Sequence, residues 1–216
     1  MDNKSDKLIK EFLVKYPVKS IDKKQIILFP DEEPKGLYYL ISGRVRQYDI
    51  NEQGDEVVLF LNKPGDFFPM TWAIGQIDNE YFFETSTSID IKIIPQSDIN
   101  FFLKNNPDVL YDLLGRIYTN ISYMERRIVH LMGGNSHSRI IFELINACKE
   151  FGQKQKDGSY LLHMHEEELA HIVGLSRETV SRELSKLKQL KIMDINHTDL
   201  IVTDLDVLEN ELGSKL

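Results

Sequence analysis

Residues 165–190 read HEEELAHIVGLSRETVSRELSKLKQL, and their pattern is the clearest structural signal in the C-terminal part of the chain. Apolar residues recur three and four positions apart on both sides of residues 173–175, which predicts two short amphipathic helices joined by a tight turn. Gly174 can adopt the turn conformation without steric conflict, and Ala170 is small where the two helices must cross. The stretch therefore predicts a helix-turn-helix whose second helix buries Val180, Leu184 and Leu187.

The opposite face of the second helix is polar and carries Arg177, Glu178, Ser181, Arg182 and Ser185. Arginine can bind guanine O6 and N7 with two hydrogen bonds, and glutamate can accept one from cytosine N4, so this face is suited to reading base edges in the major groove. Ser176 and Thr179 are expected at backbone phosphates. The alternative is a solvated helix face with ion pairs such as Glu178 with Arg182.

Two alternating runs follow in IMDINHTDLIVTD, residues 192–204, and predict a hairpin around residues 196–199 that would form the wing of a winged helix-turn-helix. His197 at its tip is expected either at a DNA phosphate or as a plain turn residue.

Residues 108–132 contain no proline and one internal glycine, and they follow Asn106-Pro107, a typical helix entry. One long helix is predicted. Apolar residues recur along it at heptad spacing: Leu110, Leu114, Ile117, Ile121, Met124, Ile128 and Leu131. Such a seam favours a parallel homodimer about this helix. The alternative is a stripe that packs on the same chain, but core helices usually bury a broader face.

Gly133-Gly134 should end this helix, with Asn135 or Ser136 as the N-cap of the next one. Paired glycines make this position a domain boundary and a candidate hinge, or else a simple helix terminus.

The first half of the chain is predicted to be a small β-barrel or roll. Short apolar or alternating segments lie between turn residues: KQIILF (24–29), LYYLISG (37–43), RVRQYDI (44–50), EVVLFL (56–61) and YFFETSTSIDIKII (81–94). Asn51–Gly54 is expected to form a hairpin turn. The first 20 residues are expected to include a short helix that ends by Pro17.

Composition excludes several classes of protein. The chain has 216 residues, 42% of them hydrophobic and 28% charged, as expected for a folded globular protein. No stretch looks like a signal peptide or a membrane helix, so a cytoplasmic protein is expected. The single cysteine, Cys148, excludes an intrachain disulfide or a four-cysteine metal site, and it is expected to be a buried small apolar residue.

The net charge of −8 argues against a protein that coats nucleic acid by positive charge alone. Residues 176–191 are nevertheless locally basic. All six histidines lie at or beyond His130, so the predicted strands hold no histidine for a metal-dependent barrel enzyme. His163, His165 and His171 match no standard set of metal ligands. The alternative to a DNA-binding protein is a ligand-binding β-barrel protein or enzyme whose C-terminal helices serve interaction only.

The string GLSRETVSR, residues 174–182, closely resembles the recognition-helix motif of the Crp/Fnr family of bacterial transcription regulators. LYYLISGRV (37–45), the turn at Gly54 and PGDFF (64–68) resemble that family's cyclic-nucleotide-binding-type β-roll, and the resemblance covers nearly the whole chain. It implies an α+β fold in three parts: an N-terminal sensor β-roll (a double-stranded β-helix) over residues 1–106, a dimerisation helix and hinge over 107–134, and a winged helix-turn-helix over 135–216.

The resemblance also implies the partners. Residues matching Arg177, Glu178 and Arg182 read a TGTGA-type half-site in one branch of the family, and those matching Glu178, Ser181 and Arg182 read TTGA in another. This chain carries both sets, which implies a palindrome in double-stranded DNA with TGA in each half. Contact with RNA polymerase is implied by family membership alone, and activation or repression would depend on the position of the operator.

The residues argue against the family's known signals. Pro69-Met70 replaces a Gly-Glu pair of cyclic-AMP-binding members, the Arg-Ser pair that holds phosphate falls near Asn79-Glu80, and Met124-Glu125 replaces the Thr-Ser pair that contacts adenine. No cyclic-AMP binding is therefore expected. An iron–sulfur cluster lacks its four cysteines, and haem lacks a histidine in the roll. No cofactor is predicted.

An apolar, aromatic-rich region remains in the roll and on the long helix. A hydrophobic small-molecule effector could lodge among Met70, Trp72, Tyr123 and Met124. The alternative is that these side chains simply fill the roll.

Overall fold

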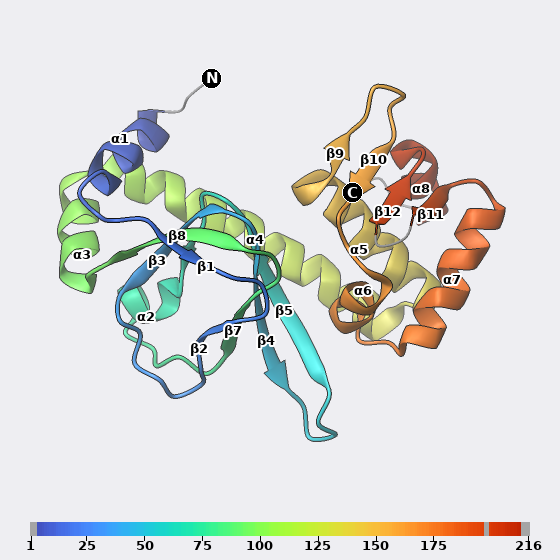
Figure 1. Ribbon diagram of the computed structural model, residues 1–216, viewed down its shortest axis with the longest axis horizontal. Helices are drawn as coiled ribbons and strands as arrows, with labels where there is room; N and C mark the ends of the chain where they lie inside the picture. Colours follow the sequence, from blue (N-terminus) through green and yellow to red (C-terminus); the bar gives the residue numbers. More distant parts are fainter. Residues whose placement is uncertain (1–3, 197–198, 213–216) are drawn as a thin grey trace. The chain divides into compact units, whose positions relative to one another are not determined.

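The computed structural model describes residues 4–196 and 199–212. The chain divides into two compact units, Met1–Asn120 and Ile121–Leu216 (Figure 1). Helix α4 (Pro107–Gly133) runs from the first unit into the second. The fold is the predicted α+β type, with a β-sandwich, a long helix and a helix-turn-helix that carries a small sheet.

The first unit contains two four-stranded antiparallel sheets. One sheet has the order β1 (Lys19–Ile21), β8 (Ile89–Ile94), β3 (Leu37–Ser42) and β6 (Phe67–Phe68). The other has the order β2 (Ile26–Leu28), β7 (Phe82–Thr85), β4 (Val45–Ile50) and β5 (Glu56–Asn62). Buried side chains from both sheets form one core, among them Leu28, Leu40 and Phe83. The five predicted segments all contain strands, and the predicted roll is confirmed.

The hairpin predicted at Asn51–Gly54 is also confirmed. Asn51 N–H donates to the Asp55 carbonyl, Gly54 N–H donates to the Asn51 carbonyl, and Gly54 takes a φ of +86°. This turn sets the antiparallel register of β4 and β5, which project beyond the other strands in Figure 1.

Helices cover the outer side of the first sheet. They are α1 (Lys4–Leu13), α2 (Met70–Gly75), α3 (Gln96–Asn105) and the start of α4. Their apolar residues form a second core with Leu37, Phe67 and Ile94 of the strands. The short N-terminal helix expected before Pro17 is thus present as α1.

A sharp corner separates α4 from α5 (Ser136–Phe151). At Gly134 a Cβ atom would lie 2.4 Å from the His130 carbonyl oxygen, so the chain can turn this closely only with glycine there. Asn135 caps α5 by accepting a 2.9 Å hydrogen bond from the Ser138 N–H. The predicted end of the long helix and one of the two predicted caps are confirmed.

The second unit is built around α5, whose Ile140, Ile141 and Leu144 are fully buried. Around it lie α6 (Glu166–Val173), α7 (Arg177–Gln189) and α8 (Leu205–Glu211). A four-stranded sheet has the order β11 (Met193–Asn196), β12 (Asp199–Val202), β10 (Tyr160–Leu162) and β9 (Gln153–Lys154). Strands β11 and β12 form the predicted wing hairpin. His197 lies outside the described residues.

No helix in the described part of the chain is long and apolar enough to span a bilayer. Within residues 4–196 and 199–212, no cluster of three or more histidine, cysteine, aspartate or glutamate side chains is placed to hold a metal ion.

Candidate nucleic-acid interface

The turn between α6 and α7 is held by a left-handed glycine and by a serine cap. Gly174 has a φ of +64°, and its N–H donates to the Ala170 carbonyl at the end of α6. The Ser176 hydroxyl accepts from the Thr179 N–H at 3.3 Å and lies 3.1 Å from the Thr179 hydroxyl. These bonds satisfy groups at the start of α7 and fix where it begins. Ser176 and Thr179 therefore have a local structural role, whether or not they also contact phosphate.

The inner face of α7 is as predicted. Val180, Leu184 and Leu187 are each 0% exposed. Because three fully buried side chains leave a helix little freedom to roll, they determine which side chains point outward.

The outer face gathers the predicted base-reading residues. Arg177, Glu178, Arg182 and Ser185 are exposed, and Ser181 is half-buried. The Arg182 side chain is 65% exposed, and its Nε lies 4.0 Å from the carboxylate of the adjacent Glu183. The Arg182 guanidinium, which carries several hydrogen-bond donors, therefore lies on the outer face of α7.

Glu178 lies in the first turn of α7. Its own backbone N–H and the Ser176 hydroxyl hydrogen-bond its carboxylate and hold its pKa below the usual value. Because it stays ionised at neutral pH, Glu178 can act as an acceptor for a base amino group.

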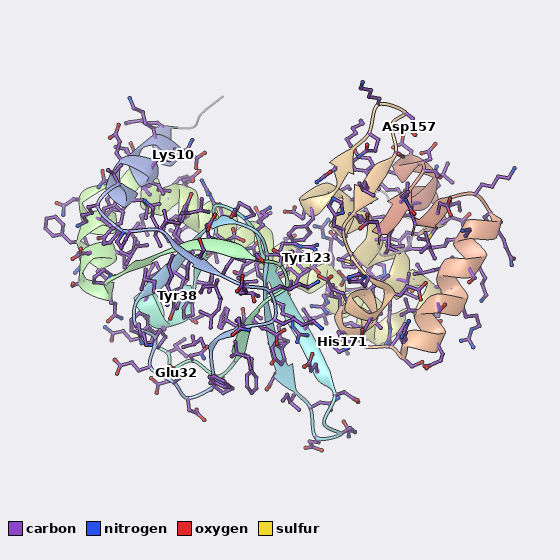
Figure 2. All side chains as sticks on the ribbon, in the orientation of Figure 1. Lys10, Glu32, Tyr38, Tyr123, Asp157 and His171 are labelled. Atoms are coloured by element: carbon purple, nitrogen blue, oxygen red, sulfur yellow. The ribbon has the colours of Figure 1, made fainter. Side chains whose placement is uncertain are left out.

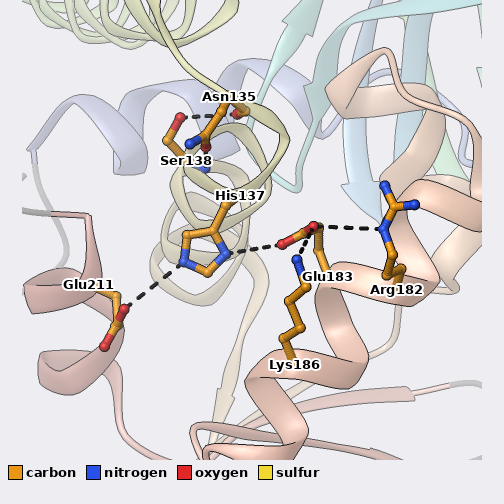
Figure 3. A network of polar contacts seen from close by, with 7 residues as sticks. All are labelled: Asn135, His137, Ser138, Arg182, Glu183, Lys186 and Glu211. Atoms are coloured by element: carbon orange, nitrogen blue, oxygen red, sulfur yellow. Dashed lines mark hydrogen bonds and ion pairs between the residues drawn. The ribbon is translucent and has the colours of Figure 1, made fainter.

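Sequence reasoning missed a buried acid on the same helix. Glu183 is only 4% exposed, and its carboxylate points toward His137 at the start of α5 (Figure 3). His137 Nδ1 at the start of α5 lies 3.3 Å from Glu183 Oε2, and Lys186 Nζ lies 2.8 Å from Glu183 Oε1. The hydrogen bond from Lys186, with a smaller contribution from His137, lowers the pKa of Glu183. Glu183 thus attaches the recognition helix to α5.

The α4 seam divides into two rows. Leu114, Ile121 and Ile128 are 43%, 44% and 49% exposed, whereas Leu110, Ile117, Met124 and Leu131 are half-buried. Sequence reasoning missed three neighbours: Tyr111, Tyr118 and Met132 are 81%, 69% and 85% exposed. The exposed apolar face of α4 therefore lies on one side of the predicted seam.

The predicted effector residues are distributed over both units. Met70 and Trp72 pack against the core formed by α1, α3 and the first sheet. The Tyr123 hydroxyl, in the second unit, donates to Glu143 Oε2 at 2.8 Å, and its ring stacks on Phe142. The effector site stays a prediction.

The residues near the expected phosphate position do not fit a cyclic nucleotide. Asn79 is 4% exposed, and its amide donates to the carbonyls of Phe29 and Tyr81 at 2.8 and 2.7 Å. A side chain committed to two backbone acceptors is not available to a phosphate, and the next residue, Glu80, is an exposed acid.

The structure also places His163 and Cys148, for which no functional site is expected. His163, which directly follows β10, has its Nδ1 3.0 Å from Oδ1 of Asp199 in β12, and this contact joins the wing to the rest of the sheet. Cys148 is 1% exposed, and burial raises the pKa of its thiol to about 12, so it is the buried apolar residue that was expected.

A β-sandwich joined through a long helix to a winged helix-turn-helix whose outer face exposes Arg177, Glu178 and Arg182 defines a class of DNA-binding regulators. Comparison with known proteins narrows the class. Residues 138–211 match the Crp-like helix-turn-helix domain, and residues 18–106 match the cyclic nucleotide-binding domain. The chain belongs to the Crp/Fnr family: it is a DNA-binding transcription regulator and not an enzyme.

Individual relatives are distant but nearly full-length. The chain is 24% identical over 188 residues to the global nitrogen regulator of Nostoc sp., covering 86% of this chain and 84% of the relative. It is 26% identical over 190 residues to the cAMP-activated global transcriptional regulator CRP of Pasteurella multocida, covering 87% and 88%. A CRP/FNR-family regulator from Thermus thermophilus has the same fold, with a TM-score of 0.75, 24% identity and coverage of 93% and 100%.

Proposed function

We propose that the protein is a homodimer that reads a palindromic operator with TGA in each half-site. The observation that carries this proposal is the outer face of α7, where Arg177, Glu178 and Arg182 are exposed while the inner face of the same helix is completely buried. Guanine and cytosine edges are the partners that arginine and glutamate recognise in the major groove.

The exposed face of α4 supports the dimer. Three large apolar residues of α4 are spaced four and three positions apart and are each more than 40% exposed: Leu114, Tyr118 and Ile121. Large apolar side chains in such a row on a long helix favour a second helix as their partner. A two-fold axis along α4 would require half-site centres about 34 Å apart on the DNA.

The proposal includes a division of roles: residues 1–106 sense, 107–134 dimerise and 135–216 bind DNA. It includes no cyclic-AMP control, which the bonding of Asn79 supports, and no iron–sulfur cluster. Contact with RNA polymerase rests on the family. Whether the bound dimer activates or represses depends on where the operator lies relative to the promoter.

Band shifts with Arg182→Ala test the recognition face. We expect the variant to lose about 1–3 kcal/mol of operator affinity per half-site contact, because a base-reading arginine is removed. Lys149→Ala is the matched control, since it removes one cation of the same unit that pairs with Glu209 at 2.7 Å. The control should bind nearly as the parent does. Parental binding by Arg182→Ala would show that α7 does not read the operator.

A further inference from the structure

A buried polar cluster lies behind the helix-turn-helix, where α4 packs on α5. Arg127 of α4 and Glu143 of α5 are 5% and 6% exposed, and Arg127 Nε lies 2.9 Å from Glu143 Oε1. The hydroxyl of Tyr123, labelled in Figure 2, donates to the other carboxylate oxygen of Glu143. Burial raises the pKa of Tyr123, which keeps this donor proton in place.

Arg127 also contacts the helix-turn-helix itself. Its Nη2 donates a hydrogen bond to the backbone carbonyl of Ile172, in the last turn of α6. The last carbonyls of a helix lack partners within the helix, and a cation there interacts favourably with the helix dipole. The flat guanidinium can hold a carboxylate and a carbonyl at once in a fixed geometry, which a lysine ammonium does less well.

The position of this contact is informative. Ile172 lies two residues before Gly174, at which the chain turns toward α7, and α7 begins at Arg177. Anchoring the end of α6 therefore anchors the turn. A buried ion pair is a poor source of net stability, because desolvation of the two charges offsets most of their attraction, so its value lies more in the geometry that it imposes.

Further contacts brace the same region across the Gly133-Gly134 corner. Arg139 Nη2 donates to the Leu131 carbonyl at 2.6 Å, and the rings of His130 and Phe142 lie 4.5 Å apart. Together with Arg127 and Glu143, these contacts join the last part of α4 to α5 on both sides of the glycines. The ion pair thus connects a braced corner to the end of α6.

We propose that Arg127 is a positioning residue for DNA binding, which it serves by tying the end of α6 to the α4–α5 corner so that the turn and the recognition helix are correctly placed. The inference rests on the proposed reading of an operator by α7. It assigns to Arg127 and Glu143 a role in operator affinity although neither residue lies on the DNA-reading face.

The test is the double variant Arg127→Met/Glu143→Gln in the full-length protein. It removes both charges together, so no buried charge is left unpaired, and the glutamine oxygen can still accept from Tyr123. The operator is first selected from random DNA with the parent protein. Binding to this operator and to non-specific DNA is then measured, together with the melting temperature.

We expect the double variant to bind the operator at least about tenfold more weakly, with non-specific binding unchanged and a melting temperature within about 4 °C of the parent. Lys149→Ala, which breaks an ion pair between α5 and α8, should leave operator binding unchanged. If the double variant is folded and binds the operator like the parent, the positioning role is wrong. It is also wrong if operator and non-specific binding fall together in step with lost folding.

If the double variant fails to fold, Arg127→Lys tests the positioning role instead. This variant keeps a cation beside Glu143 and loses only the planar guanidinium with its fixed donors. Weaker operator binding by this folded variant supports the role, and parental binding overturns it. A parent that selects no operator at all would instead contradict the proposed function, so the two failures are distinguishable.

Discussion

Glu183 is a residue of α7 with a structural role on the side of the helix away from the predicted DNA-reading face. It lies between Arg182, which points outward, and Leu184, which is fully buried, and its carboxylate contacts His137 and Lys186. Hydrophobic periodicity treats every charge as a surface residue, so it could not reveal that this acid faces the protein. The same reason hides Arg127 and Glu143, whereas the positions of Val180 and Leu187 follow directly from the apolar pattern.

Glu183→Gln should destabilise the protein by about 1–3 kcal/mol at neutral pH, because a buried charge-assisted contact is lost. The pKa of Glu183 is lowered in the folded state, so its stabilising effect is complete above the unfolded pKa of about 4.3 and is lost as the pH falls through the lower folded pKa. The difference between parent and variant in urea unfolding should therefore shrink as the pH falls below about 4.5. A gap that stays constant down to about pH 3 would mean that Glu183 ionisation is not its source.

Among the elements, the long helix and the helix-turn-helix were predictable, whereas strands β1, β6, β9 and β10 were not. Helix α4 has 27 residues and shows its period several times, which makes the pattern unambiguous. Strands β1 and β6 have three and two residues, too few to show any alternation, and both form only by pairing with strands distant in sequence. The heptad pattern identified an apolar stripe on α4 but could not show that Tyr118 and Met132 extend its exposed part.

Ile121→Glu should convert the proposed dimer to monomers. Each copy would place a carboxylate at the centre of the seam, and burying two like charges should raise the dimer dissociation constant by at least about 100-fold. Sedimentation over a range of concentrations measures the change. Thr119→Glu is the matched control, because it adds the same charge at an exposed position of α4 outside the seam. An Ile121→Glu protein that sediments as a dimer would place the interface elsewhere.

The whole chain has the fold of its family, but some of its residues differ from those expected in cyclic-AMP-binding members. The match to a cyclic nucleotide-binding domain covers residues 18–106, yet Asn79 is bonded to backbone carbonyls and Pro69-Met70 stands where the Gly-Glu pair is expected. A fold match reports the course of the chain, whereas ligand binding depends on a few side chains within it. A chain can therefore keep the fold of a cyclic nucleotide-binding domain without binding a cyclic nucleotide.

Calorimetric titration with cyclic AMP should show no binding stronger than about millimolar, because a phosphate near residues 79–80 would meet a committed amide at Asn79 and an acid at Glu80. A cyclic-AMP-activated relative in the same buffer serves as the positive control. Micromolar binding by this protein would refute the expectation and would restore nucleotide control to the proposed function.

The overall charge of −8 is a property of the whole molecule that bears on DNA binding. Arg177, Arg182, Lys186, Lys188 and Lys191 form a local basic stretch on an acidic protein. We therefore expect phosphate attraction to be weak and easily screened by salt, so that discrimination between DNA sequences rests on a few base contacts.

The partners of Glu143 lie upstream of α5, and this matters to anyone who expresses the DNA-binding part of the gene alone. A fragment that starts at Ser136 would bury the Glu143 carboxylate without Arg127 or Tyr123 and would leave the end of α6 without its donor. Cloning from Ile121, where the compact unit begins, keeps these side chains in the same polypeptide. The useful boundary for excision therefore falls inside a continuous helix rather than at the glycine pair.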